Sequence, residues 1–372
     1  MSSENAPPIV PSSQETSSPE PSSQAVNSRE ITSEEAVTNE ASSQETGGLG
    51  ILHVKRLWSR IQTTRAGHGH DSKTTDDWIK DNTLLSGLKL GLRETLQFLY
   101  SSPSLERFEQ WILERNGGAI DPALKDRLNR ALSAEGKTGP PPEPADAVFT
   151  SEELAFWEEN GYIVLHHGVP EENCAAAAEA ICKFLQMDLR NPESWYRGPQ
   201  GHSIWIPLLH HPALEANREA ARIHQAFAQI WGRTDLWATT DQTGMNPPER
   251  EGWKFPGPNL HWDTSLALPI PFGVQGVLYL TDTAAHQGAF TCVPGFHRKI
   301  EAWLKSLPAG SDPRHENLEA LGAVPIAGKA GDLIIWNNAL PHGSSPNRAA
   351  MPRIVQYITL RPSYWEYNPT WR

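Results

Sequence analysis

The chain is short of cysteine, of basic charge and of long apolar stretches. Its three cysteines are an odd number without metal-ligand spacing, which suits a reducing interior better than a disulfide scaffold. A net charge of -12 argues against a groove that binds nucleic acid. No apolar run is long enough to cross a bilayer, so we expect no membrane span.

The first 46 residues are rich in Ser, Glu, Pro and Thr and contain almost no large apolar residue after Val10. Such a segment cannot bury enough apolar surface to offset the entropy cost of ordering it, so we expect residues 1–46 to be a disordered, acidic tail. The tail has neither the pattern of a signal peptide nor the composition of a mitochondrial transit peptide. These features favour a cytoplasmic location.

Residues 47–136 have a helical pattern, with leucines on one face. The leucines that recur at intervals of three or four are Leu84 or Leu85, Leu88, Leu92, Leu96 and Leu99. Ser104 is expected to cap a second helix, and Asp121-Pro122 to begin a third. We expect a structural region that packs against the next domain or forms a homo-oligomer contact; a lid or partner-docking module is the alternative.

Residues 137–148 are proline-rich and predict an extended linker to a larger domain, residues 149–372. That domain is expected to begin with a capping box from Thr150 to Glu153. Strands are expected in several apolar, β-branched runs, which together provide a sheet scaffold. These runs are Tyr162 to His166, Val274 to Thr281, Ala289 to Val293 and Asp332 to Trp336.

The triplet His261-Trp262-Asp263, followed far downstream by His342, is the strongest candidate site. Two imidazoles and one carboxylate can hold Fe(II) on one face and leave the opposite face open. On a strand, His261 and Asp263 would point to one side and Trp262 to the other. A similar triplet at His68–Asp71 has no strand around it, and a solvated loop is the better interpretation there.

In this region the chain resembles the phytanoyl-CoA dioxygenase family of Fe(II)- and 2-oxoglutarate-dependent oxygenases, over residues 149–361. The resemblance rests on several motifs in the family's order. They are a helix followed by Glu-Asn-Gly-Tyr at 159–162, the triplet at 261–263, the segment 288–297 ending in Pro-Gly-Phe-His, the Gly-Asp strand 331–336 and the distal-histidine segment 341–353. Together these motifs are specific, although each alone is weak.

The resemblance implies a mainly β fold, a double-stranded β-helix or jelly roll with flanking helices. It also implies that His261, Asp263 and His342 bind iron and that Arg353 pairs with the distal carboxylate of 2-oxoglutarate. A planar guanidinium matches a carboxylate with two parallel hydrogen bonds, so an arginine suits this task.

Arg348 is the rival of Arg353, but it lies in a turn, whereas Arg353 begins a β-branched run whose alternation fixes the direction of its side chain. Ser344, two residues after His342, would face the same site if the strand continues, and the resemblance implies that it helps to hold 2-oxoglutarate, as a matching serine does in the family. Its alternative role is a turn hydroxyl that bonds its own backbone.

The implied activity is hydroxylation, or desaturation, of an unactivated C–H bond with Fe(II), 2-oxoglutarate and O2. Large aromatic side chains near the site favour a small hydrophobic or aromatic substrate. The tryptophans concerned are Trp195, Trp205, Trp231, Trp237 and Trp253. The alternative is a non-oxidative jelly-roll metalloprotein, a hydrolase, isomerase or binding module, that uses the same three ligands.

Overall fold

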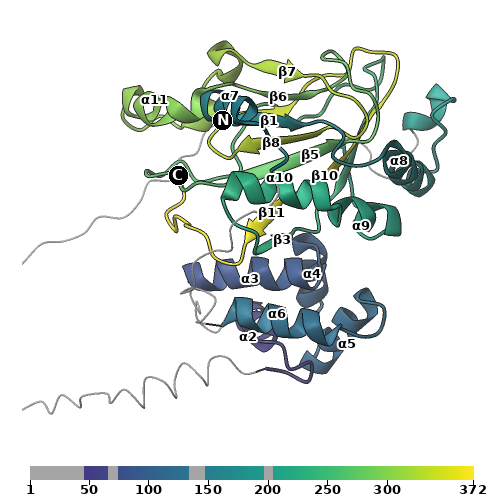
Figure 1. Cartoon of the computed structure of the whole chain (residues 1–372), viewed down its shortest axis with the longest axis vertical. Helices are drawn as coiled ribbons and strands as arrows, with labels where there is room; N and C mark the ends of the chain where they lie inside the picture. The colour runs from purple at the N-terminus through teal and green to yellow at the C-terminus, as the bar shows by residue number, and fades with distance from the viewer. Residues whose placement is uncertain (1–45, 66–73, 134–146, 197–203) are drawn as a thin grey trace, which may run out of the picture. The chain divides into compact units, whose positions relative to one another are not determined.

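The computed structural model describes residues 46–65, 74–133, 147–196 and 204–372 (Figure 1). The predicted acidic tail, the His68–Asp71 segment and most of the predicted linker therefore lie outside the described residues. Within the described ranges, no helix has the length and apolar character needed to cross a membrane. All three cysteines are free thiols.

The first part of the described chain is helical. Its helices are α2 (Val54–Arg65), α3 (Thr75–Gly87), α4 (Leu92–Tyr100), α5 (Leu105–Arg115) and α6 (Pro122–Leu132). The predicted caps are confirmed: the Ser104 side chain accepts a hydrogen bond from the backbone of Arg107, and the Asp121 side chain accepts one from Ala123. The helical region thus contains two more helices than the three expected.

The single helix expected through Leu84 to Leu99 is wrong, because the chain breaks between α3 and α4. Lys89 has a left-handed backbone with φ of 52°, and Gly91 begins α4 with its backbone N–H bonded to Glu94. Leu84, Leu88 and Leu99 are buried, whereas Leu92 is 44% exposed. The leucine spacing continues across the break, which is why the sequence pattern does not show it.

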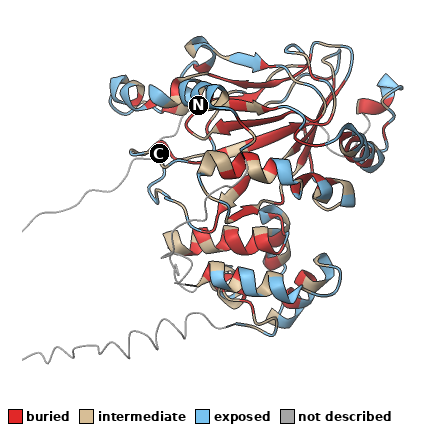
Figure 2. Cartoon of the chain, viewed as in Figure 1, coloured by how far each residue is buried: buried red, intermediate tan, exposed pale blue. Residues whose placement is uncertain are grey.

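A six-stranded antiparallel sheet forms the centre of the second part, and Figure 2 shows its strands mainly as buried residues. In spatial order its strands are β1 (Tyr162–Leu165), β8 (Leu333–Asn337), β5 (Val274–Tyr279), β10 (Arg353–Tyr357), β4 (Thr243–Asn246) and β2 (Trp205–Ile206). The strands expected at 162–166 and 274–281 are thereby confirmed with slightly shorter bounds, and the strand expected at 332–336 is confirmed one residue further along the chain.

Two smaller sheets accompany it. One has the order β7 (Val324–Ile326), β6 (Phe290–Cys292), β9 (His342–Ser344), and the other pairs β11 (Leu360–Pro362) with β3 (Leu236–Ala238). Val277 and Ile334 of the large sheet share one apolar cluster with Phe290 of the three-stranded sheet, so these two sheets pack face to face. In the described residues they do not join into a closed barrel.

Helices cover the other face of the large sheet. They are α7 (Ser151–Asn160), α8 (Glu171–Leu185), α9 (Pro212–Arg218) and α10 (Ala221–Trp231). Helix α11 (Ile300–Ser306) lies between β6 and β7 in the chain, and its buried residues belong to the cluster of the three-stranded sheet. Leu278 and Ile335, which alternate with the residues of the inner face, pack with Ile181 and Phe227 of these helices. The predicted capping box of α7, Thr150 with Glu153, is present.

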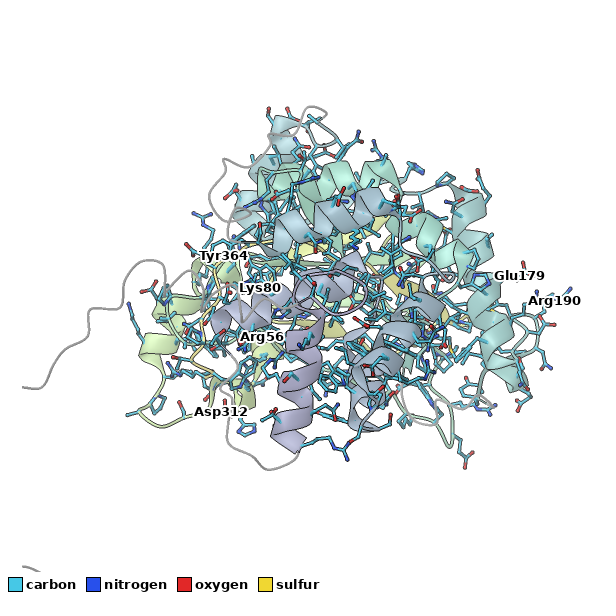
Figure 3. The ribbon with its side chains drawn as sticks, turned by 90° about the horizontal axis from the view of Figure 1, so that it is seen from below. Arg56, Lys80, Glu179, Arg190, Asp312 and Tyr364 are labelled. Atoms are coloured by element: carbon cyan, nitrogen blue, oxygen red, sulfur yellow. The ribbon has the colours of Figure 1, made fainter. Side chains whose placement is uncertain are left out.

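The helical region packs on the β3–β11 pair. Trp237 of β3 belongs to the same apolar cluster as the leucines of α3 and α6, and its indole N–H donates to the Ser363 hydroxyl at 2.7 Å. Arg127 of α6 donates to the Leu236 carbonyl at 2.9 Å. In the view from below, Arg56 and Lys80 lie on these helices, whereas Arg190 lies at the outer edge beyond α8 (Figure 3).

Candidate metal centre

The triplet 261–263 meets the distal histidine through the backbone. His261 and His342 exchange two backbone hydrogen bonds, of 2.9 and 3.0 Å, in a single β-bridge beside β9. The expectation that the whole triplet lies on a strand is wrong, because no ladder continues beyond this bridge and Asp263 lies in a bend. The expected alternation still holds for Trp262, which is buried and packs against Phe296.

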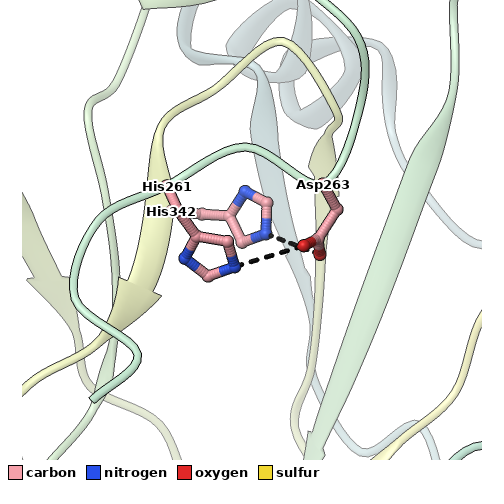
Figure 4. Close-up of side chains that lie close together, drawn as sticks. All are labelled: His261, Asp263 and His342. Atoms are coloured by element: carbon pink, nitrogen blue, oxygen red, sulfur yellow. Dashed lines mark hydrogen bonds and ion pairs between the residues drawn. The ribbon is translucent and has the colours of Figure 1, made fainter. Parts of the chain in front are cut away.

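Three donor groups converge in front of this bridge (Figure 4). The ligand atoms of His261, Asp263 and His342 all lie within 4.8 Å of one another. Each imidazole directs Nε2 at the carboxylate of Asp263, at 3.3 Å for His261 and 3.4 Å for His342. The Asp263 side chain is half exposed, whereas His342 is buried, so the carboxylate lies on the open side of the group.

The other nitrogen of each ring is fixed by a backbone carbonyl. Nδ1 of His261 lies 2.8 Å from the Asn259 carbonyl, and Nδ1 of His342 lies 3.0 Å from the Leu340 carbonyl. A carbonyl accepts a hydrogen bond and cannot donate one, so Nδ1 carries the proton in both rings. With Nδ1 protonated, Nε2 is the atom that can give up its proton and present a lone pair to a metal, the usual arrangement around metal-binding histidines.

The electrostatics of the group favour a carboxylate. Burial by itself would raise the pKa of Asp263, but hydrogen bonds from His261 and His342 hold it far below its ordinary value. Gln275 of β5 also donates to the Asp263 Oδ2 atom at 2.9 Å. Burial would lower the pKa of His261, yet the hydrogen bond and charge of Asp263 raise it overall. A divalent cation bound between the rings and Asp263 would replace the Nε2 protons as the positive charge beside this carboxylate.

Arg353 lies in the same cavity as the three donors. It is only 1% exposed, and its Nε and Nη2 atoms are buried without a hydrogen-bond partner among the described residues. Ser344 lines the cavity as well, and Arg348 does not. Burial raises the pKa of Tyr357, while the charge of Arg353 and hydrogen bonds with Arg353 and Ser344 oppose the rise. Arg353, Ser344 and Tyr357 thus form one polar group.

The cavity has a volume of about 580 Å³, well inside the range of about 300–1,000 Å³ found for small-molecule sites. Aromatic residues line its apolar part, among them Trp205 of β2, Phe290 and Trp336. Of the five tryptophans singled out in the sequence, Trp205 is the one that contributes to this cavity. Residues of α4 complete its wall.

Some residues of the site are not evident from the sequence. Tyr357 lies four residues after Arg353, and strand alternation could have found it. Gln275 of β5 belongs to none of the sequence motifs described above. Arg314 comes from a distant segment, and its guanidinium donates to the carbonyls of Trp262 and Thr264, at 2.6 and 2.7 Å, so it holds the backbone on both sides of Asp263.

The donor chemistry fits the groups that the resemblance implies. Two imidazole Nε2 atoms and one carboxylate are the ligand set of non-haem Fe(II) oxygenases. A buried guanidinium with unpaired N–H groups requires an anion, and a carboxylate matches its geometry. The described residues offer no carboxylate partner to Arg353, so a dicarboxylate bound in the cavity would satisfy it.

Comparisons with known proteins agree on one family. A family model described as phytanoyl-CoA dioxygenase matches residues 157–355, more than half of the chain. A putative phytanoyl-CoA dioxygenase of Dictyostelium discoideum is 22% identical over 262 residues, covering 56% of this chain and 74% of that protein. An ectoine dioxygenase of Nocardia farcinica is 22% identical over 259 residues, covering 63% and 87%.

Among solved structures, EctD from S. alaskensis with bound Fe is 20% identical, with a TM-score of 0.45, and the match covers 60% of this chain and 81% of that one. The α-ketoglutarate-dependent carbocyclase SnoK from nogalamycin biosynthesis is 18% identical, with a TM-score of 0.44, covering 62% and 90%.

Proposed function

Because this chain belongs to the phytanoyl-CoA dioxygenase family, and is therefore an oxygenase that uses iron and 2-oxoglutarate, we propose that it hydroxylates or desaturates a small hydrophobic or aromatic molecule. The reaction takes place at an unactivated C–H bond of that molecule. The apolar and aromatic lining of the cavity supports this substrate class.

We propose His261, Asp263 and His342 as the iron ligands. When bound, Fe(II) and 2-oxoglutarate supply the activation of O2 that C–H oxidation requires. His261 and His342 present Nε2 atoms whose lone pairs are left free by the Nδ1 hydrogen bonds. The third ligand is the Asp263 carboxylate, and Gln275 fixes one of its oxygens.

We propose Arg353 and Ser344 as the residues that hold the distal carboxylate of 2-oxoglutarate. The observation that carries the proposal is the buried guanidinium of Arg353 in the cavity of the three donors, because its Nε and Nη2 atoms have no hydrogen-bond partner among the described residues. Since it is shielded from water, its hydrogen bonds to a carboxylate are stronger than those at the surface. Tyr357 holds the guanidinium in place from the same strand. The facing sheets are then the two halves of a jelly roll.

The test is binding and turnover of 2-oxoglutarate. Anaerobic addition of 2-oxoglutarate to the Fe(II)-loaded protein should give a weak visible charge-transfer band, and O2 should then yield succinate. Asp263→Ala should lose both, because it removes a ligand. Arg353→Gln should bind iron normally but weaken 2-oxoglutarate binding by about 30-fold or more, the cost of a buried charge pair.

Arg348→Gln is the matched control, because Arg348 does not line the cavity, and it should leave the band unchanged. Full succinate formation by Asp263→Ala would contradict the proposal. Metal binding without any 2-oxoglutarate-dependent band would favour the non-oxidative metalloprotein, which gives Arg353 no task.

A further inference from the structure

Helix α4 presents one face to the core of the helical region and another to the cavity. Thr95 and Leu99 are buried in that region. Leu92, Leu96 and Tyr100 lie four residues apart on the helix and line the cavity. Leu92 is 44% exposed and Tyr100 is 54% exposed, although both are large apolar side chains. The cavity-facing side of α4 therefore carries three large apolar side chains that have no role in the core, beside the polar Arg93 and Gln97.

The beginning of α4 is fixed against the sheet-bearing part of the chain. A Cβ atom at Gly91 would lie 2.8 Å from Leu209 Cδ1 and 3.3 Å from the Thr240 carbonyl, so α4 begins in close contact with both residues. Glu94 accepts a hydrogen bond from the Gly91 N–H and contacts Nε2 of His210 at 2.6 Å. These contacts hold the start of α4 in position, so its side chains form one wall of the cavity.

Arg361 of β11 supplies a charge to the same cavity. It lies opposite Trp237 in the β3–β11 register, so its side chain points to the side of the helical region. Among the described residues, its guanidinium forms no hydrogen bond or ion pair, and it lines both this cavity and a smaller hollow of about 350 Å³ beyond Asp263. Burial lowers the pKa of Arg361, while the charges of Asp241 and Asp263 oppose this.

The charges of the cavity indicate the charge of the molecule that fills it. The positive charges of Fe(II) and Arg353 are balanced by the negative charges of Asp263 and of 2-oxoglutarate. The remaining charged residues of the lining are Arg93, Arg361 and Asp241. Asp241 accepts a hydrogen bond from the Thr239 hydroxyl and offsets one of the two guanidinium groups. One positive charge is left over, which favours an anionic occupant.

We propose that α4 and Arg361 form the subsite for the oxidised substrate, and that this substrate is an apolar molecule with a single carboxylate. Its apolar body lies against Leu92, Leu96 and Tyr100, and its carboxylate pairs with Arg361. This inference rests on the proposed function, because it takes Arg353 to be engaged by 2-oxoglutarate. It narrows the substrate from hydrophobic molecules in general to apolar monocarboxylates.

The test uses two probes of this class, decanoate and 2-naphthylacetate, each compared with its methyl ester. Calorimetric titrations are made with the full chain loaded with Fe(II) and 2-oxoglutarate under anaerobic conditions. Wild-type protein should bind each acid about tenfold more tightly than its ester, because the ester lacks the charge-assisted pair. In Arg361→Gln the acid should lose this advantage, and the ester should bind as it does to the wild type.

Arg190→Gln is the control for the charge, since the Arg190 side chain is 92% exposed, does not line the cavity and lies at the outer edge of the molecule in Figure 3. It should keep the preference for the acid. Leu92→Ser should weaken acid and ester alike by about fivefold, because it removes apolar contact area. Phe184→Ser changes a side chain of similar exposure, 40%, on α8 and should have no effect.

Equal affinity of wild-type protein for acid and ester, binding of neither probe, or an acid preference that survives Arg361→Gln would overturn the subsite. Succinate formation without probe is followed separately in the wild type and the two controls. Its absence from the wild type would count against the proposed function, whereas the comparison of acid with ester would still decide the subsite.

Discussion

Single residues outside the ligand set hold the candidate metal centre together. Asp263 has no ladder of backbone hydrogen bonds around it, and Arg314 replaces that ladder by binding the carbonyls on both of its sides. The three donors and Arg353 are predictable from motif spacing, because their residue types and order carry the pattern. Arg314 and Gln275 are not, since each reaches the site from a segment without any motif.

Arg314→Ala should weaken Fe(II) binding by about 10- to 100-fold, the usual effect of losing a group that orients a ligand. The fold should persist, because the removed contacts reach only the segment around Asp263 and the last two residues, Trp371 and Arg372. Fe(II) titration followed by the charge-transfer band measures the effect. The control is Arg298→Ala, at an exposed arginine of the 3-10 helix Phe296–Arg298. Equal Fe(II) affinity in the two variants would refute the role of Arg314.

Gly343, between His342 and Ser344, allows β9 to approach the segment before His261. A Cβ atom there would lie 2.6 Å from the Asn259 carbonyl oxygen and 3.0 Å from that of Pro258. Gly343→Ala should therefore separate His261 from His342, with a loss of stability of about 1–3 kcal/mol. Iron binding should fall more steeply than thermal stability; an unchanged iron affinity would show that the two backbones tolerate the extra methyl group.

At the scale of helices and strands, periodicity predicts where elements lie better than where they end. The leucines of residues 84–99 keep their spacing across the break at Lys89 and Gly91, so this spacing predicts one helix where α3 and α4 occur. Hydrogen-bonding residues mark the ends more reliably: the caps at Ser104, Asp121 and Thr150 were all predictable. A cap is a local contact, whereas the bend after His261 depends on Arg314, about 50 residues away in sequence.

Helix α3 offers a test of such a cap through pH. The Asp77 carboxylate accepts hydrogen bonds from the backbone N–H and the hydroxyl of Thr74, and from Arg56 Nε at 2.7 Å. Burial would raise the pKa of Asp77, but these contacts hold it well below the ordinary value of 3.8. A lowered folded-state pKa adds stability above pH 3.8, and this stability is lost as the pH falls below that value.

Asp77→Asn should therefore destabilise the protein by about 1.5–3 kcal/mol at pH 7. The difference between the two proteins should shrink as denaturant unfolding is repeated at pH 5, 4 and 3. A difference that stays constant over this range would mean that the charge of Asp77 contributes nothing.

At the scale of the whole molecule, the helical region and the sheet-bearing part share a core. Trp237 of β3 packs among the leucines of α3 and α6, and Thr83 of α3 donates to the Ser363 carbonyl at 3.2 Å. The sequence predicts both parts but not this shared core, because Trp237 lies far in sequence from its partners. The expected domain boundaries and the homo-oligomer contact stay predictions.

Trp237→Ala should lower the free energy of unfolding by about 3–5 kcal/mol, the range for removing a buried aromatic side chain. Because the core is shared, helical and tertiary signals should be lost in one transition at a lower temperature. Far-UV and near-UV circular dichroism measure the two signals. Phe184→Ala, at an exposed site, should change little, and two separate transitions in the wild type would show that the parts unfold independently.

The position of α4 has a consequence for how this protein is related to others. The family match begins at residue 157, and α4 ends at Tyr100. One wall of the cavity is thus formed by a helix that lies outside the residues matched by the family model. From the subsite proposed above, we expect relatives with equally good family matches to oxidise different compounds where this helix differs, even when the proposed iron ligands are the same.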